Sequence, residues 1–466
     1  MQKIFEEVSS LDDRCYKNFF LSEDILMEHA ANGMASYIKH NCLNDSKVVI
    51  AVGSGNNGAD GIALARLLHK HCNVSLFFVK EPKSQMALLQ EKRAQALGIA
   101  VINELQECDV LVDAIVGSGF HGNFNEKITT ILNKINSLQA FKIACDVPSG
   151  LKTNGECANT VFQADVTLTM GALKKSLFLD EAKDIVGRIE VLDLGIAREV
   201  YEIQTNWQLL DSDDLQLPTR TTQNSHKGSF GHLAVICGEK QGAGIMAARA
   251  GLKFGVGLMT LVGYENQQLL NIPHSLMYSH TLPNNTTAIA CGMGLGNEFS
   301  NKELQNFLQN DLPLLVDADI FYMDIILDIL HRKNIVLTPH PKEFVSLLKM
   351  TNLADITVEE LQKNRFKYTE LFCKAYPDAT LLLKGANVII AKENSFFINP
   401  HGSSKLAKGG SGDVLSGLIG ALLAQGYNPL DAAIHGSLTH TKLAKNYTGA
   451  DFSLTPDDLI QGIGNL

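Results

Sequence analysis

The sequence predicts an α/β protein built from two domains, and three observations support this prediction. Short apolar runs alternate along the chain with longer amphipathic runs, a pattern typical of strands and helices in α/β folds. The chain has 466 residues, which is more than one ordinary domain contains. A polar segment at residues 211–228 separates two such alternating stretches. We therefore predict one α/β domain over residues 1–205 and a second over residues 206–466.

The apolar and amphipathic runs predict the elements of each stretch in order. In the first stretch, strands are expected at residues 48–52, 74–79, 110–115, 142–147 and 166–170. Helices are expected between them at residues 22–39, 59–71, 84–97 and 126–135. In the second stretch, strands are expected at residues 232–237, 258–262, 288–291, 314–318, 335–338 and 380–384. The helices expected there include residues 242–254, 302–308, 358–375 and 412–424.

Composition and charge narrow the class of protein. Hydrophobic residues make up 45% of the chain and charged residues 19%, which indicates a folded globular protein, and the net charge of −10 disfavours binding to nucleic acid. The nine cysteines are scattered without CxxC spacing, so we expect a reducing compartment, no disulfides and no zinc site. The N-terminus lacks a signal-peptide pattern, and no apolar run is long enough to span a membrane. We expect a cytoplasmic protein with no membrane partner.

A polar glycine loop at residues 53–61 follows the first predicted strand and opens a helix. It matches GxGxxG, and Glu81 ends the next strand about where a ribose-binding acid would sit, so one interpretation is an ordinary NAD-binding turn. The loop is more polar than such a turn requires, because it also carries Asn56, Asn57 and Asp60. This favours a loop that contacts a ligand through its side chains.

Two further strands of the first stretch end in polar groups. Asp113 stands inside an apolar run, and the largely apolar residues 141–145 of the next strand run into Asp146 and Ser149. The carboxyl ends of parallel strands meet at one edge of a sheet, so Asn57, Asp113 and Ser149 are expected to meet there as oxygen ligands for a hard cation, with Asp146 facing the ligand. Taken singly, Asp60 would cap a helix, Asp113 would make a structural hydrogen bond and Ser149 would be a turn residue.

Residues 55–61, 113–117 and 146–150 resemble the three signature segments of NAD(P)HX epimerases. The resemblance implies a Rossmann-like three-layer α/β/α domain that binds K+ through Asn57, Asp113 and Ser149 and uses Asp146 as acid or base. It implies substrate contacts from Asn56, Asn57, Gly58, Ala59, Asp60, Gly117, Ser118, Gly119, Phe120, His121, Gly122, Asn123 and Asp146. The chain departs from some members of the family at His121, where they carry Lys or Arg.

The most informative segment of the second stretch is the glycine string at residues 408–417, which opens an apolar helix. Backbone amides at a helix N-terminus form an anion site. A carboxylate beside that site repels phosphate, so Asp413 is better explained as a base that takes a proton from an attacking hydroxyl than as a phosphate ligand. The alternative is that Asp413 only caps the helix.

This arrangement resembles the anion hole and base of the ribokinase-like superfamily, and residues 226–440 resemble the ADP/ATP-dependent NAD(P)HX dehydratases more closely. The supporting segments are residues 226–232, 292–296, 316–319, 337–343 and 383–386. The resemblance implies that the nucleotide contacts Lys384, Gly385, Ala386, Asn387, Gly409, Gly410, Ser411 and Gly412. It implies that the hydrated nicotinamide contacts Ala243, Gly294, Gly296, His340 and Asp413. The chain departs from many relatives at Lys408, where they carry Thr.

These resemblances together predict a bifunctional enzyme of nicotinamide nucleotide repair. The first domain would interconvert the R and S forms of NADHX and NADPHX, and the second would dehydrate the S form with Mg2+ and ADP, giving AMP and phosphate. Relatives assemble, so we expect a homo-oligomer. Two alternatives remain open: a small-molecule kinase of the ribokinase-like type, and a first domain that only binds or scaffolds. The sequence leaves the choices between ADP and ATP, and between NADHX and NADPHX, open.

Overall fold

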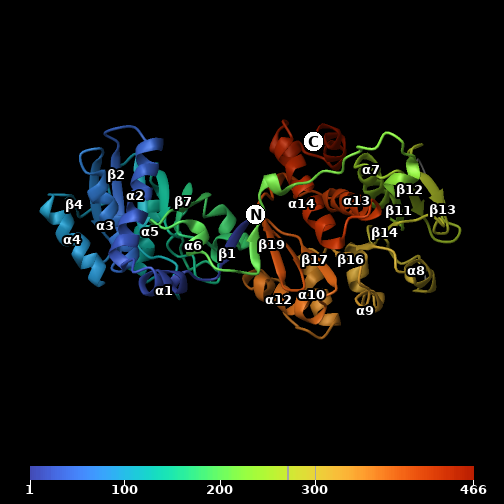
Figure 1. The fold of residues 1–466 in the computed structure, drawn as a ribbon, viewed down its shortest axis with the longest axis horizontal. Coiled ribbons are helices and arrows are strands. Elements are labelled where there is room, and N and C mark those ends of the chain that lie inside the picture. Colours follow the sequence, from blue (N-terminus) through green and yellow to red (C-terminus); the bar gives the residue numbers. More distant parts are fainter. Residues whose placement is uncertain (270–271, 300) are drawn as a thin grey trace. The chain divides into compact units, whose positions relative to one another are not determined.

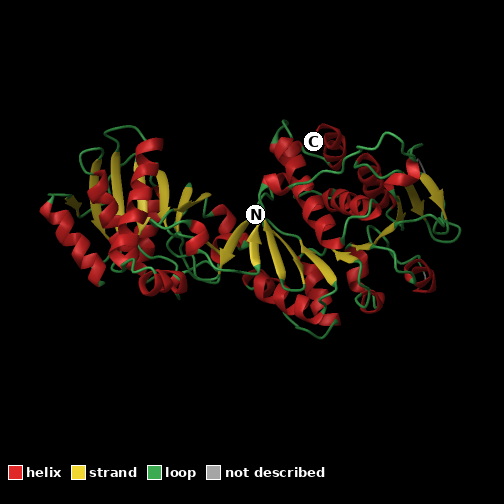
Figure 2. Ribbon diagram, in the orientation of Figure 1, coloured by secondary structure: helices red, strands yellow, loops and turns green. Residues whose placement is uncertain are grey.

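The computed structural model of the protein describes residues 1–269, 272–299 and 301–466 (Figure 1). The chain divides into two compact units, one spanning Gln2–Thr205 and the other Asn206–Leu466. In each unit a layer of strands is covered by helices (Figure 2). No helix in the described part of the chain is both long enough and apolar enough to cross a membrane.

The N-terminal unit contains a sheet in which all neighbouring strands run parallel. The strand order is β4-β3-β2-β5-β6-β7-β9. The strands are β2 (Lys47–Val52), β3 (Asn73–Phe78), β4 (Ala100–Ile102), β5 (Val110–Ala114), β6 (Phe141–Cys145), β7 (Val166–Met170) and β9 (Arg188–Leu192). The chain winds outward in one direction from β2 and in the other from β5. Ligands of such sheets bind at the carboxyl ends of the strands where the winding reverses.

Helices cover both faces of this sheet, which makes three layers. They are α2 (Glu23–Asn41), α3 (Asn56–Leu68), α4 (Gln85–Ala96) and α5 (Glu126–Ser137). Successive side chains of a strand point to opposite faces, and β2 shows the consequence directly. Ile50 belongs to the core cluster that contains α2 and α3 residues, whereas Val49 belongs to the cluster that contains α5 residues. The predicted Rossmann-like three-layer architecture is therefore present.

Several short elements of this unit escaped the sequence analysis. They are β1 (Gln2–Phe5), α1 (Ser9–Asn18), β8 (Leu173–Lys174) and α6 (Arg198–Tyr201). β1 pairs in parallel with β8, which places Phe5 opposite Lys174. Leu11 and Tyr201 share a small core cluster beside α2. The two ends of the unit are thus packed together, although nearly the whole unit separates them in sequence.

The C-terminal unit has a longer sheet, in the order β13-β12-β11-β14-β15-β16-β17-β18-β19-β10. Neighbouring strands are parallel from β13 to β17, and the pairs β17-β18 and β18-β19 are antiparallel. The strands are β10 (Trp207–Leu209), β11 (His232–Ile236), β12 (Leu258–Val262), β13 (Met277–Ser279), β14 (Ala288–Cys291), β15 (Leu314–Val316), β16 (Ile335–Leu337), β17 (Ala379–Leu383), β18 (Val388–Lys392) and β19 (Ser395–Asn399). The winding reverses between β11 and β14.

Helices also lie on both sides of this sheet. One set consists of α7 (Gln241–Lys253), α13 (Ser411–Ala424), α14 (Pro429–Asn446) and α15 (Pro456–Gly462). The others are α8 (Asn301–Leu308), α9 (Ile325–Ile329), α10 (Pro341–Met350), α11 (Val358–Lys363) and α12 (Arg365–Ala375). In Figure 1, α10 and α12 lie on the opposite side of β17 and β19 from α14. Every residue of α13 from Val414 to Ala424 is buried, which explains why its sequence is apolar all round.

The predicted strands and helices are present, with ends shifted by a few residues. One predicted helix is wrong in extent: residues 358–375 form two helices, α11 and α12, which meet at Asn364. The helix that follows the start of the glycine loop, α3, begins at Asn56, earlier than predicted. β18 and β19 follow β17 as antiparallel strands, and the alternation of helices and strands gave no sign of them.

Candidate active sites

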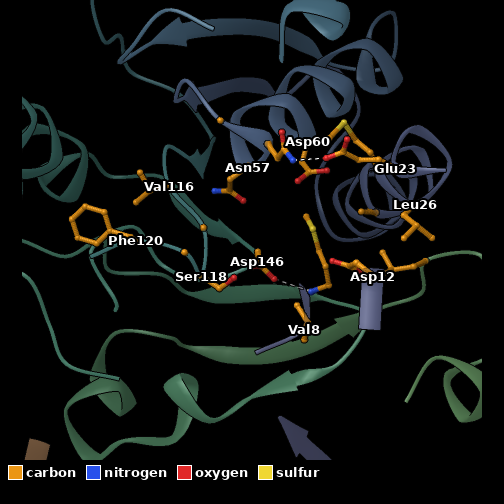
Figure 3. Close-up of a pocket in the computed structure, with 18 of the residues that line it drawn as sticks. Val8, Asp12, Glu23, Leu26, Asn57, Asp60, Val116, Ser118, Phe120 and Asp146 are labelled. Carbon is orange, nitrogen blue, oxygen red and sulfur yellow. Dashed lines mark hydrogen bonds between the residues drawn. The ribbon is translucent and has the colours of Figure 1, made fainter. Parts of the chain in front are cut away.

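A cavity of about 700 Å³ lies where the winding of the N-terminal sheet reverses, at the carboxyl ends of β2, β5 and β6 (Figure 3). The predicted residues that line it are Asn56, Asn57, Asp60, Gly117, Ser118, Gly119, Phe120, His121 and Asp146. Of the predicted substrate contacts, all of which the structure describes, four lie outside this lining: Gly58, Ala59, Gly122 and Asn123. Asn123 instead accepts a hydrogen bond from the backbone N–H of Asn159.

The glycines of the first loop are required by close backbone contacts. A Cβ on Gly53 would lie 1.8 Å from the carbonyl oxygen of Ile115, and one on Gly58 would lie 2.1 Å from the carbonyl oxygen of Gly53. Only glycine permits these approaches. Gly55 is the N-cap of α3 and has open space around it. The loop therefore brings the start of α3 directly against the segment that follows β5.

The three predicted cation ligands come together beneath this loop. Ser149 donates through Oγ to Oδ1 of Asp113 at 2.6 Å, and its backbone N–H donates to Oδ2 at 2.7 Å. The N–H of Val116 donates to Ser149 Oγ at 3.0 Å, and a Cβ on the next residue, Gly117, would lie 3.5 Å from Asn57 Oδ1. Burial raises the pKa of Asp113 to about 6. Asn57 Nδ2 is buried without a hydrogen-bond partner among the described residues.

Asp146 is held by a residue that the sequence analysis missed. Lys174 donates from Nζ to Asp146 Oδ1 at 2.6 Å and to Thr169 Oγ1 at 2.9 Å, and its side chain is only 1% exposed. The backbone N–H of Met170 also donates to Asp146 Oδ1, at 3.2 Å. Asp146 adopts a left-handed backbone conformation, with φ of 72°. A lysine within an otherwise apolar run was the available sequence signal, and β8 places it against the strand end of β6.

Asp60 is not the N-cap of α3, as one interpretation of the sequence held, because Gly55 occupies that position. Its side chain lines the cavity from the second turn of the helix, and the residue is 8% exposed. In the described part of the chain it has no hydrogen bond or ion pair. Burial raises the pKa of Asp60 well above its ordinary value, and the neighbouring carboxylates of Asp146, Asp12 and Glu23 raise it further.

The N-terminal helices supply another wall of the cavity that the sequence did not indicate. Its side chains include Val8, Asp12, Tyr16 and Leu26 (Figure 3). Tyr201 lies at the same wall and donates through its hydroxyl to Asp12 Oδ1 at 2.7 Å. Burial raises the pKa of Asp12. These residues come from distant parts of the sequence, and the pairing of β1 with β8 and a shared core cluster bring them together.

The second candidate site lies at the carboxyl ends of the C-terminal strands. Asp317, directly after β15, accepts from Lys384 Nζ at 2.6 Å through Oδ1 and from Ser416 Oγ at 2.7 Å through Oδ2. A Cβ on Gly412 would lie 3.5 Å from Lys384 Nζ, so the lysine reaches the first turn of α13. The side chain of Asp317 is 3% exposed. This ion pair joins the ends of β15 and β17 to the glycine string.

Asp413 stands in the first turn of α13, and the N-cap of that helix is Gly410, so Asp413 does not cap it. The pKa of Asp413 is raised to about 6. Burial is the largest cause, the neighbouring carboxylate of Asp317 also raises the pKa, and Lys384 lowers it. A carboxyl with this pKa is ionised at neutral pH and remains basic enough to take a proton.

The glycine string forms the start of α13. Gly410 has φ of 91°, and a Cβ there would lie 2.7 Å from Pro456 and 3.0 Å from Met246, so no larger residue fits. Ser411 Oγ lies 3.0 Å from Nε2 of His440, a buried residue of α14 that the sequence analysis did not select. Burial lowers the pKa of His440 to about 4, so the imidazole is neutral. Lys408 Nζ donates to the carbonyl of Phe452 at 2.9 Å.

The predicted contacts of the hydrated nicotinamide lie in loops after β11, β14 and β16. A Cβ on Gly294 would lie 3.1 Å from Cβ of Ala243, so these two residues are neighbours. The N–H of Gly296 donates to Asp319 at 3.0 Å. His340 caps α10 by accepting from the N–H groups of Lys342 and Glu343 through Nδ1.

The loop of Lys384, Gly385, Ala386 and Asn387 follows β17. The N–H of Lys384 donates to the carbonyl of Pro339 at 2.9 Å, which ties this loop to the one carrying His340. Arg365, buried in α12, donates to the carbonyl oxygens of Leu383 and Lys384 at 3.2 and 3.0 Å. The predicted nucleotide loop is thus fixed by a guanidinium group that the sequence analysis did not identify.

Comparison with known proteins finds two family models that match this chain, one over each candidate site. Residues 233–464 match the model described as NAD(P)H-hydrate dehydratase, and residues 23–176 match the model of the YjeF-related protein N-terminus. A protein of Helicobacter pylori named bifunctional NAD(P)H-hydrate repair enzyme Nnr is 42% identical over 100% of both chains. The chain belongs to this family of bifunctional repair enzymes. The Nnr protein of Dictyoglomus turgidum is 30% identical over 98% of this chain and 96% of its own.

A solved structure of this family matches the C-terminal unit of the repair enzyme. It is the ADP/ATP-dependent NAD(P)H-hydrate dehydratase of Bacillus subtilis, co-crystallised with ATP and Mg2+. The identity is 25%, the TM-score is 0.48, and the match covers 56% of this chain and 98% of the other.

Proposed function

We propose that the N-terminal unit is an NAD(P)H-hydrate epimerase and the C-terminal unit an ADP-dependent (S)-NAD(P)H-hydrate dehydratase. The boundary between them is placed at residue 205. Both candidate sites lie at the carboxyl ends of parallel strands, and the N-terminal one lies where the winding reverses, which is where such sheets bind ligands. Membership of the bifunctional family supports both activities in one chain.

The observation that carries the dehydratase assignment is Asp413, in the first turn of a glycine-capped helix beside the ion pair of Asp317 and Lys384. The backbone amides of Gly409, Gly410, Ser411 and Gly412 receive phosphate oxygens, and Lys384 offers its ammonium group beside them. Asp413 takes the proton of the ring hydroxyl as that oxygen attacks the terminal phosphoryl group of ADP. AMP leaves, and loss of phosphate together with a proton from the adjacent ring carbon then restores the ring double bond.

Two ions fit the residues present. Asn57, Asp113 and Ser149 offer an amide, a carboxylate and a hydroxyl oxygen, which is the donor set that a hard cation such as K+ takes. The buried carboxyl of Asp113 is consistent with a site that a cation completes. Mg2+ would enter with ADP and neutralise charge on its phosphates.

One assay tests both assignments. A mixed preparation of R and S hydrate is incubated with protein, Mg2+ and ADP, and the absorbance of reduced nicotinamide is followed. Full recovery is expected, because the epimerase supplies the form that the dehydratase uses. Recovery of only the S share would contradict the epimerase assignment. A stable phosphorylated product without recovered absorbance would instead indicate a small-molecule kinase.

A further inference from the structure

Two carboxyl groups enter the N-terminal cavity in opposite electrostatic settings. Figure 3 shows Asp60 and Asp146 directed into the cavity from different sides. Asp146 is paired with a buried ammonium group at 2.6 Å. Asp60 is buried and, among the described residues, has no cation or hydrogen-bond donor. One carboxyl therefore has a cation beside it, whereas the setting of Asp60, which offers none, favours a carboxylic acid.

We propose that Asp60 is the general acid and Asp146 the general base of inversion at the hydroxyl-bearing ring carbon, and that Lys174 is the positioning residue that holds Asp146 in place. This inference rests on the proposed epimerase activity and assigns roles within it. Two carboxyl groups in environments this different can serve as the acid and the base of one reaction.

The contacts of Lys174 show why it positions Asp146 and does not donate to substrate. Its ammonium group is held by Asp146 Oδ1, Thr169 Oγ1 and the carbonyl of Met170, and it is absent from the described lining of the cavity. All the described hydrogen bonds to Asp146 go to Oδ1. Oδ2 of Asp146 is thereby left for the ligand.

The remaining charged groups facing Asp60 all favour its protonated form. Asp146, Asp12 and Glu23 are its charged neighbours, and each is acidic. Glu23 accepts a hydrogen bond from Asn56 Nδ2 at 2.5 Å, and Asp12 accepts from Tyr201, so both are already engaged. Among these four carboxyl groups, Asp60 is therefore the one suited to donate a proton to a ligand. It has no hydrogen-bond partner among the described residues.

The proposed step balances atoms and protons. Asp60 gives its proton to the ring hydroxyl while the carbon–oxygen bond breaks, water leaves, and the lone pair of the ring nitrogen forms a carbon–nitrogen double bond. A water molecule then adds to the opposite face of the ring. Asp146 takes a proton from that water as the electron pair returns to the ring nitrogen. The site is left with Asp60 ionised and Asp146 protonated, which is the state required for the reverse inversion.

The first test is Asp60→Asn, which preserves the size and the neutral charge of the group. General acid catalysis contributes about 100-fold or more to a rate. We expect kcat for epimerisation to fall by about that factor with KM unchanged, while dehydration of pure S hydrate continues at the wild-type rate. The wild-type chain is assayed beside the variant. Failure of the wild-type chain to epimerise would contradict the proposed activity, which is a different outcome from failure of the role assigned to Asp60. A kcat within about threefold of wild type would overturn it.

The second test separates a positioning role of Lys174 from a merely structural one. The rate of epimerisation is measured over a range of substrate concentrations for Lys174→Met and Lys174→Arg. Loss of the cation removes the partner that holds Asp146 Oδ1, so kcat of Lys174→Met is expected to fall with KM unchanged. The arginine variant is expected to recover part of kcat, because it keeps a cation beside Asp146. A wild-type kcat in Lys174→Met, or a loss that arginine does not reduce, would contradict the assigned role, even if the variant is less stable.

The third test follows the oxygen atom. Epimerisation is run in ¹⁸O-labelled water beside an enzyme-free control, and the hydrate is analysed by mass spectrometry. The step predicts one solvent oxygen incorporated for each inversion. Inversion with the original oxygen retained would overturn the proposed loss and return of water.

Discussion

Lys384 lies with Nζ 2.6 Å from Oδ1 of Asp317, and this ion pair sets the charge next to Asp413. Burial and Asp317 raise the pKa of Asp413 to about 6, and Lys384 opposes them. An ionised base is required, so dehydration should increase with pH through about 6. The two partners of one ion pair therefore have opposite effects on the same catalytic group.

Substitution of either partner should move the acid limb of dehydration in a stated direction. Lys384→Met removes the charge that lowers the pKa of Asp413, so the limb should shift to higher pH. Asp317→Asn removes a charge that raises it, so the limb should shift to lower pH. The measurement is kcat against pH at saturating ADP. Shifts in the same direction for both variants would contradict the assignment.

Asp60→Asn should stabilise the N-terminal unit at neutral pH. The pKa of Asp60 is raised in the folded protein, so the folded state binds more protons than the unfolded state above the ordinary value of 3.8. Its burial therefore costs stability progressively as pH rises from 3.8 toward the raised pKa. Denaturant unfolding of the variant should show a higher midpoint than wild type at pH 7 and an equal one near pH 3. The exposed Asp13→Asn serves as the control.

His440 should make the C-terminal unit sensitive to acid. Its pKa is lowered from 6.5 to about 4, so the unfolded state binds more protons between these values and stability falls as pH decreases through that range. The difference corresponds to about 3 kcal/mol. Unfolding measured at pH 7.5 and 4.5 should show a smaller loss in His440→Gln than in wild type. The exposed His331→Gln should keep the wild-type dependence.

Gly58 should be essential for folding of the first site, whereas Gly55 should not. A Cβ at Gly58 would lie 2.1 Å from a backbone oxygen, so Gly58→Ala should lower the free energy of unfolding by about 2 kcal/mol or more. Gly55 has open space around it, and Gly55→Ala should cost at most about 1 kcal/mol as a weaker N-cap. Thermal unfolding of the two variants measures the difference. Equal losses would show that the close contact is not what requires glycine.

K+ should stabilise the N-terminal unit through Asn57. We expect its melting temperature to be higher in KCl than in choline chloride of the same ionic strength, because a ligand of the folded state raises stability. Asn57→Ala should abolish this difference. Asn56→Ala, one residue earlier, should retain it, since Asn56 donates to Glu23. A difference that survives in Asn57→Ala would place the ion elsewhere.

The sequence predicted those parts of the two sites that lie in contiguous motifs at strand ends. Asp113 and Ser149 were selected because a polar group within or after an apolar run is visible without coordinates, and Lys384 was selected by the resemblance to the dehydratases. Lys174 was missed because its strand has only two residues and pairs with β1 at the start of the chain. His440 was missed because a buried histidine on an amphipathic helix has no local signature. The raised pKa of Asp60 depends on burial and on neighbours from α1, α2 and the segment after β6, which no local pattern reveals.

The burial of α13 has a consequence for ligand screening. The turn proposed to receive phosphate is continuous with a helix whose residues 414–424 lie in the core of its unit. The turn keeps its conformation as long as that core is folded. A ligand bound in the turn should therefore raise the melting temperature of the whole unit. A compound present at 100 times its Kd adds about 2.7 kcal/mol to such a transition. Inhibitors of the nucleotide site should therefore be detectable by thermal shift alone, without preparing the unstable hydrated cofactor.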